Sequence, residues 1–399
     1  MKRIVIEWPL TPYTGWGSYG IQLAQALAER PDLEAALLYS SNISPQCDAA
    51  WQGYCRYLET RSAGLIAQQG NLAQGDLLET SATLALTALG NVAVPPRCLA
   101  AHQAAVTFFE RSALDPGYVQ RLAPFELVVT GSHWNRQVLE RSGFGRVAMV
   151  HQGVDASRFN ATPIPRLLQR PLVVFSGGKL EARKGQDLVL RAFRRVLERE
   201  PEALLIACWT NLGNVGLQTI GSCEGINGAP AAGKDAELKA WLAANGLPER
   251  NVYVPTLLAN AQLPALIKQA DAAVFLSRCE GGTNLMAMES LACGVPTLIS
   301  SNTGHLDLAA MAMEHCIALP RRREPVAGEF LRGYGGDPAG DWGDTDPELV
   351  AEQLLAIAAD REGWRARGQR GAATMPDLSW RRSMAELLGL LEERGLLEA

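Results

Sequence analysis

The stretch from Cys279 to Ser300 combines residue types that could bind and react with an anionic ligand. It reads C-E-G-G-T-N-L-M-A-M-E-S-L-A-C-G-V-P-T-L-I-S and holds two glutamates, Glu280 and Glu289. Two glycines precede the helix-capping residues Thr283 and Asn284. A helix N-terminus with unpaired amides beside two glycines suits an anion such as phosphate. The pattern therefore indicates a ligand site at the start of a helix.

The elements around this stretch form a strand-helix-strand unit. Residues 272–276 are apolar and predict a strand, a helix follows from about Leu285, and Gly294 ends that helix. Pro296 then opens a second strand over 297–300. Such a unit places its first turn at the carboxyl edge of a parallel sheet, where open α/β sheets bind ligands. We therefore expect the glycine turn to face a cleft.

Length and composition limit the class of protein. With 399 residues the chain is long enough for two or three domains, and 47% hydrophobic and 20% charged residues are typical of a soluble globular protein. A net charge of −5 argues against general affinity for nucleic acid, because such binding depends on neutralising phosphates. Scattered cysteines predict reduced thiols, and no stretch reads as an export signal or membrane span, which favours a cytoplasmic location.

Strand and helix patterns alternate through two successive regions. The first covers residues 1–160, and a proline-rich linker with no sustained period follows at 161–171. The second region covers 172–376, and 377–399 is expected to be mainly one helix. The sequence therefore predicts an α/β protein with two doubly wound, Rossmann-like domains that face a cleft.

The signature run E-G-G-T-N-L-M-A-M-E-S-L-A-C-G-V-P resembles that of glycosyltransferase family 4, retaining sugar-nucleotide enzymes with the two-domain GT-B fold. In that family two glutamates separated by seven residues flank the turn, whereas eight residues separate Glu280 from Glu289 here. Either Gly281 and Gly282 absorb the extra residue, so that Glu280 reaches the donor sugar, or the backbone near Gly282 takes its place. We favour absorption, because glycine accepts unusual dihedrals.

The resemblance implies a role for each residue of the signature. Glu280 acts on the donor sugar, Glu289 holds the nucleotide ribose, and the residues between them bind the donor: Gly281, Gly282, Thr283, Asn284 and Leu285. It also implies that the last helix returns to pack on the N-terminal domain.

A basic motif after the linker resembles the diphosphate clamp of the same family. Residues 177–185 read G-G-K-L-E-A-R-K-G, and the resemblance assigns Gly178, Lys179 and Lys184 to the donor diphosphate. Lys179 stands where arginine is usual, so a point charge replaces a bidentate fork. Two cations would balance the charge that the leaving diphosphate gains, so no metal or other cofactor is expected.

The resemblance also places residues from several loops around the substrates. These are Gly15 and Gly17 beside the diphosphate, His102 near the donor sugar, Thr256 and Leu257 against the base, and Glu110 on the acceptor side. His102 is placed there because it follows a short apolar run, as a residue at the end of a strand would. The implied activity is that of a metal-independent, retaining, hexosyltransferase-type enzyme that uses a nucleotide-sugar donor and an unidentified glycan, lipid or small-molecule acceptor.

Other interpretations of these residues stay open. Residues 15–20 spell G-x-G-x-x-G, which fits a dinucleotide site or a purely structural turn, although no acid follows the next strand. A catalytically silent GT-B protein that binds sugar nucleotides or assists assembly would carry the same motifs. Arg321–Arg323 could touch anionic lipid as a peripheral membrane contact or be a solvated charge run. Asp344 and Asp346 spell D-x-D, but Asp346 before a proline is better read as a helix cap than as a metal ligand.

Overall fold

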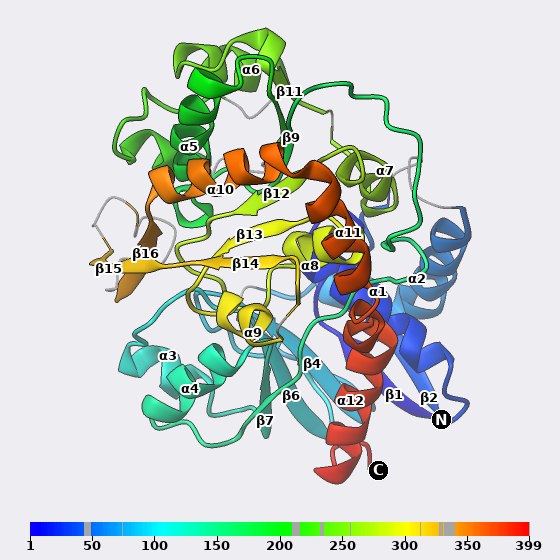
Figure 1. The fold of residues 1–399 in the computed structure, drawn as a ribbon. Coiled ribbons are helices and arrows are strands. Elements are labelled where there is room, and N and C mark those ends of the chain that lie inside the picture. Colours follow the sequence, from blue (N-terminus) through cyan, green and yellow to red (C-terminus); the bar gives the residue numbers. More distant parts are fainter. Residues whose placement is uncertain are drawn as a thin grey trace.

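A computed structural model describes residues 1–43, 49–73, 75–209, 216–231, 235–255, 257–311, 313–326, 330 and 340–398 of the chain. Two parallel sheets organise these residues, one in each half of the chain (Figure 1). Thr256 lies outside the described residues, so its predicted contact with the base has no structural counterpart here.

The first half is built on a six-stranded parallel sheet with the order β2-β1-β4-β6-β7-β8. Its strands are buried apolar runs, as expected for a parallel sheet that helices cover on both faces. The strands are β1 (Lys2–Ile6), β2 (Leu33–Leu37), β4 (Leu84–Leu89), β6 (His102–Thr107), β7 (Leu127–Thr130) and β8 (Val147–Met149). The helices are α1 (Gly15–Ala28), α2 (Ala49–Gly70), α3 (Pro116–Arg121) and α4 (His133–Arg141), and the short strands β3 (Leu78–Glu79) and β5 (Cys98–Leu99) pair separately.

The second half repeats this architecture with the order β11-β10-β9-β12-β13-β14. The strands are β9 (Val173–Gly178), β10 (Leu204–Trp209), β11 (Val252–Tyr253), β12 (Ala272–Phe275), β13 (Thr297–Ser300) and β14 (Cys316–Leu319). The helices that flank it are α5 (Gln186–Arg199), α6 (Asp235–Ala244), α7 (Leu263–Ile267), α8 (Leu285–Ala292), α9 (His305–Ala310), α10 (Pro347–Ala359) and α11 (Arg361–Ala372). An antiparallel pair, β15 (Arg321–Pro325) and β16 (Asp341–Thr345), extends from this half.

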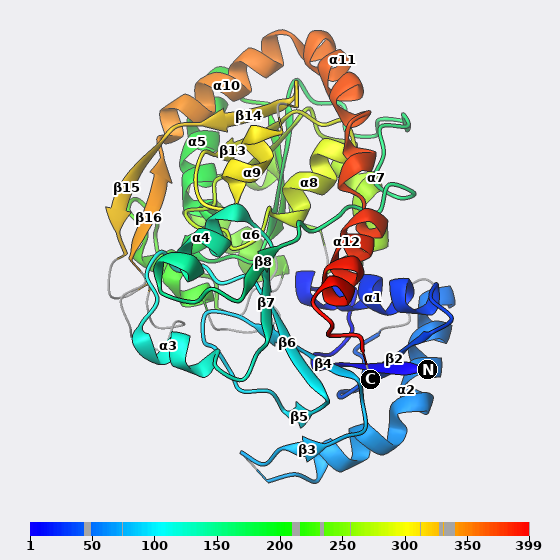
Figure 2. The same ribbon diagram turned by 90° about the horizontal axis from the view of Figure 1, so that it is seen from below.

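The last helix, α12 (Trp380–Glu393), leaves the second half and packs against the first, beside α1 (Figure 2). Met384, Leu387 and Leu391 are buried in one apolar cluster with Ile4 and Leu10. The predicted return of this helix is therefore confirmed. The domain boundaries at residues 160, 171 and 376 stay a prediction.

Local helix signals in the sequence agree with the structure at several ends. Asn284 and Ser132 cap α8 and α4 with their side chains, and Asp346 caps α10 before a proline, as predicted. Gly294 follows the last residues of α8 with φ of 74°, the left-handed conformation that favours glycine there. None of the described helices combines the length and apolar character that crossing a bilayer requires.

Two glycine-containing segments of the predicted donor site belong to regular elements. Helix α1 begins at Gly15, so Gly15 and Gly17 lie in its first turn. Gly17 is needed for packing, since a Cβ there would lie 2.1 Å from the carbonyl oxygen of Thr11. Strand β9 continues through Gly178, so Gly177 and Gly178 belong to that strand.

Candidate active site

The turn between β12 and α8 lies at the carboxyl edge of the second sheet, as the sequence predicted. Within this turn Asn284 has φ of 66°, whereas Gly281 and Gly282 have no positive φ. Asparagine tolerates the left-handed region because its short polar side chain bonds locally. Here that side chain accepts a hydrogen bond from the backbone amide of Ala287, at 3.3 Å. The unusual dihedral therefore lies at Asn284 and not at the glycines, and the absorption of the extra residue stays a prediction.

Gly281 and Gly282 allow this turn to dock on the first half of the chain. A Cβ on Gly281 would lie 2.4 Å from the carbonyl carbon of Phe108, and one on Gly282 would lie 2.4 Å from Oε1 of Gln152. Ser132 Oγ donates to the carbonyl of Gly281 at 2.6 Å across the same contact. The glycines therefore permit a close approach between the two halves.

Glu280 is the centre of a buried polar network at this contact. Lys184 Nζ donates to its Oε1 at 2.5 Å, and Ser277 Oγ donates to the same oxygen at 2.6 Å. Asn284 Nδ2 lies 3.2 Å from that oxygen. The backbone amide of Glu280 is held by Thr303 Oγ1 at 2.8 Å. Lys184 and Glu280, both predicted site residues, are therefore brought together.

Charge around Glu280 fixes its ionised form. Burial would raise the pKa of Glu280, but Lys184 and Arg183 outweigh burial and lower this pKa to about 2. Arg183 Nη1 lies 3.6 Å from Glu280 Oε2, and its other terminal nitrogen lies 3.4 Å from Oε1 of Glu110 in the first half. Arg183 also pairs with Glu181, so a network of two cations and three carboxylates spans the contact between the halves.

Glu289 lies in a pocket that both halves line. Its neighbours there include Ser18 and Gln22 of α1, together with Asp155 and Asn260. Asn260 Nδ2 donates to Oε1 of Glu289 at 2.6 Å, whereas Oε2 is buried without a hydrogen-bond partner among the described residues. An unsatisfied buried carboxyl oxygen that borders a pocket can accept hydrogen bonds from ligand hydroxyl groups.

Burial raises the pKa of Glu289 to about 8. A carboxyl whose pKa is higher in the folded than in the unfolded chain makes stability fall as pH rises between the two values, from about 4.5 to about 8. The glutamine side chain in Glu289→Gln cannot ionise. The free energy of unfolding of this variant, relative to that of wild type, should therefore increase by roughly 1.4 kcal/mol per pH unit across that window. Urea unfolding at pH 5, 6.5 and 8 measures the difference.

The control for this pH experiment is Glu79→Gln, which alters an exposed carboxyl. Its free energy of unfolding should follow that of wild type at all three pH values. If Glu289→Gln also follows wild type, the carboxyl of Glu289 is ionised in the folded protein and its assignment as an open, protonated group is wrong.

One predicted site residue, His102, is placed differently from expectation, and two others, Lys179 and Leu257, are exposed. His102 begins β6 at the amino edge of the first sheet, five residues or about 16 Å from the carboxyl end, where it faces Glu126 at 3.2 Å. Its predicted place near the donor sugar is therefore wrong. Strand β5 ends within the apolar run that precedes His102, and β6 starts at His102 itself. Lys179 is solvent-exposed, and Leu257 is 37% exposed and does not line the pocket at Glu289.

Two other predicted residues, Gly15 and Glu110, lie at the contact between the halves. A Cβ on Gly15 would lie 3.4 Å from Leu285 Cδ1, which places the start of α1 beside the start of α8. Gly178 ends β9 with φ of 118° and open space beside it. Glu110 accepts from Asn91 Nδ2 at 2.6 Å and faces Arg183. Thr283, which lies in the turn between β12 and α8, is fully buried.

Sequence reasoning missed the residues that hold the two glutamates in place. Arg183, Ser277, Thr303 and Asn260 contact Glu280 or Glu289 through side chains that come from four separate segments. Only Arg183 carried a sequence signal, because it precedes Lys184 in the basic motif. The others are ordinary polar residues that lie 3, 23 and 29 positions from the glutamate they contact, with no motif of their own.

Two parallel doubly wound sheets with a polar site at their facing carboxyl edges, and a last helix that returns to the first half, define the GT-B fold. Solved structures share this architecture over nearly the whole chain. HepE from Anabaena, solved with UDP, is 14% identical, with 98% of this chain and 100% of that chain covered and a TM-score of 0.62. Sucrose-phosphate synthase from Thermosynechococcus elongatus is 14% identical, with 98% and 99% covered and a TM-score of 0.64.

A glycosyltransferase from Rickettsia africae is 9% identical, with 98% of each chain covered and a TM-score of 0.60. At these identities the likeness shows the fold alone. Residues 160–316, which contain β9 to β13 and the signature turn, match the family model described as glycosyl transferases group 1. Comparison with curated protein sequences gives no match. The predicted resemblance to group 1 glycosyltransferases is thus confirmed, and the narrower assignment to family 4 stays a prediction.

Proposed function

We propose that the protein transfers a sugar, with retention of configuration, from a nucleotide-diphosphate donor to an acceptor. The observation that carries this proposal is the ion pair between the partly exposed Lys184 and the buried Glu280, which lies where the second sheet meets the first half. A cation held there can stabilise the charge that a leaving diphosphate gains. Glu289, in the adjoining pocket, offers an open oxygen for the ribose.

We propose the following placement of the donor. The ribose would occupy the pocket at Glu289, and the diphosphate would lie across the start of α8 toward Lys184. Gly178, which ends β9 with open space beside it, and the exposed Lys179 that follows it would close over the diphosphate. In this scheme the lysines supply the positive charge for the leaving group, and no metal ion is needed at the donor.

A thermal-shift screen of nucleotides and nucleotide-sugars, with and without Mg²⁺, tests donor binding. UDP is the first probe, because HepE, which shares the fold, was solved with UDP and with UDP-glucose. A ligand at 100 times its dissociation constant stabilises the folded state by about 2.7 kcal/mol. We expect at least one nucleotide-sugar to raise the unfolding temperature without Mg²⁺. No shift from any member of the screen would remove the proposal.

Two other functions are distinguished by simple measurements. A silent sugar-nucleotide binder would show a thermal shift but release no nucleotide from the donor. A dinucleotide oxidoreductase should be stabilised by nicotinamide dinucleotides, which we expect to have no effect, because Gly17 packs on Thr11 inside the first turn of α1.

The product should keep the anomeric configuration of the donor. Retention follows from the resemblance, and the site agrees, because a carboxylate with a pKa of about 2, paired with Lys184, is a poor general base for an inverting attack. Proton NMR of the product formed in the first turnovers measures the configuration. An inverted product would show that a base elsewhere activates the acceptor.

A further inference from the structure

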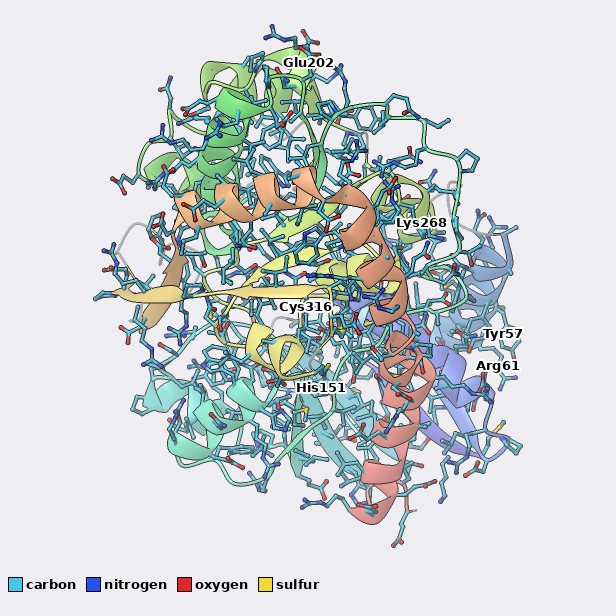
Figure 3. All side chains as sticks on the ribbon, in the orientation of Figure 1. Tyr57, Arg61, His151, Glu202, Lys268 and Cys316 are labelled. Atoms are coloured by element: carbon cyan, nitrogen blue, oxygen red, sulfur yellow. The ribbon has the colours of Figure 1, made fainter. Side chains whose placement is uncertain are left out.

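Two histidines of the first half and one aspartate of the second converge behind the signature turn. His133 begins α4, His151 follows β8, and Asp307 lies in α9. Asp307 Oδ2 lies 3.1 Å from His133 Nδ1 and 2.7 Å from His151 Nε2. Figure 3 labels His151, which lies close to α9 at the junction of the halves.

The three side chains form a set of donors suited to a transition metal. Their ligand atoms all lie within 4.8 Å of one another. Around a tetrahedral Zn²⁺, with bonds of about 2.0–2.1 Å, neighbouring ligand atoms are about 3.3 Å apart. The separations from Asp307 therefore need to widen by about 0.2 Å to His133 and by about 0.6 Å to His151. Imidazole nitrogen with one carboxylate oxygen suits zinc and its neighbours, not Mg²⁺.

The surroundings of the cluster orient one ligand and leave a path to solvent. The backbone amide of His133 donates to Asp307 Oδ2 at 3.0 Å, which holds this carboxylate toward α4. Asp307 is buried with 6% of its side chain exposed, whereas His133 is 57% exposed. Three protein ligands with one face open to solvent leave a fourth position for water.

We propose that His133, His151 and Asp307 bind a divalent transition metal, with Zn²⁺ as the representative ion, that bridges the two halves of the chain. Ser132, next to His133, donates to the carbonyl of Gly281, so the bridge would hold the signature turn docked on the first half. The ion is structural and takes no part in the proposed donor chemistry. The inference does not depend on transferase activity, since zinc binding would stand even if no donor were turned over.

Isothermal titration with Zn²⁺ tests this site. The tag-free chain of 399 residues is first treated with a chelator and then titrated. We expect wild type to bind one Zn²⁺ per chain at this site. His133→Ala and Asp307→Asn should each lower the affinity for this Zn²⁺ by at least about 10-fold. His102→Ala is the matched control, because His102 also faces a carboxylate, Glu126, but has no third ligand in its cluster among the described residues. It should bind as wild type does.

Absorption spectroscopy with Co²⁺ in place of zinc gives a second readout, because four-coordinate cobalt absorbs strongly in the visible range. That band should appear in wild type and His102→Ala and be absent from His133→Ala. The side chain of His133 is largely exposed, so this variant should fold even if Asp307→Asn does not. Failure of wild type to take up Zn²⁺, or equal uptake by His133→Ala, would overturn the proposal.

Discussion

Lys184→Ala is expected to lower turnover of the nucleotide-sugar donor by about 100-fold or more, the range for loss of one preorganised electrostatic group. The reason is the position of Lys184 Nζ, which lies 2.5 Å from Glu280 at the meeting point of the two halves. Steady-state release of nucleoside diphosphate measures the effect. Lys268→Ala, which removes an ammonium bonded to the carbonyl of Thr162, is the matched control and should retain wild-type turnover.

Stability must be separated from catalysis in this experiment, because Lys184 is also the nearest partner of a buried carboxylate. Its loss leaves Glu280 with Arg183 at 3.6 Å and should cost roughly 1–3 kcal/mol in the free energy of unfolding. The double variant Lys184→Met with Glu280→Gln removes both charges, so it should recover most of that stability but none of the turnover. Wild-type turnover in Lys184→Ala would show that another group stabilises the leaving diphosphate.

The second large effect should divide the two glutamates by function. Above pH 8, where the carboxyl of Glu289 is ionised, Glu289→Gln should weaken binding of the free nucleoside diphosphate roughly 10- to 150-fold, the range for losing a hydrogen bond to a charged group. Glu280→Gln should leave that binding intact and reduce turnover of the complete donor, because the proposed donor placement puts Glu280 at the sugar end of the site. Calorimetry with UDP and a turnover assay on both variants measure the two effects.

The pH dependence of nucleotide binding tests the role of Glu289 independently. Because burial raises the pKa of Glu289 to about 8, its carboxyl is mostly protonated at neutral pH in the free protein. Ribose hydroxyls that donate to Glu289 favour the ionised form, so affinity should rise with pH from 6 to 8 in wild type. The rise should be absent from Glu289→Gln.

Equal losses of UDP affinity in the Glu280→Gln and Glu289→Gln variants would mean that the two carboxylates are placed wrongly.

The strand and helix pattern of the chain could be read from sequence because its signals are local. Apolar runs, Ser132 and Asn284 as caps, and Gly294 after α8 each depend on residues within one turn of helix or one strand. The signature and basic motifs also predicted that Lys184 and Glu280 belong to one site, which their 2.5 Å contact agrees with.

The errors arose where a boundary decides which edge of a sheet a residue occupies. Assigning His102 to the end of one strand, and not to the start of the next, moved it from one side of the first domain to the other. The unusual dihedral lies at Asn284, and Gly281 and Gly282 pack against Phe108 and Gln152, more than 100 positions away in sequence. No local pattern carries that information.

Release of nucleoside diphosphate from nucleotide-sugars, with the Glu280→Gln variant in parallel, tests the central proposal most directly. The donor that gives the largest thermal shift is incubated with purified wild-type protein in water, which serves as a poor acceptor. We predict slow release by wild type and a loss of at least about 10-fold in the variant. Stable binding of the donor with equal, background release from both proteins would contradict transfer and leave a sugar-nucleotide binder.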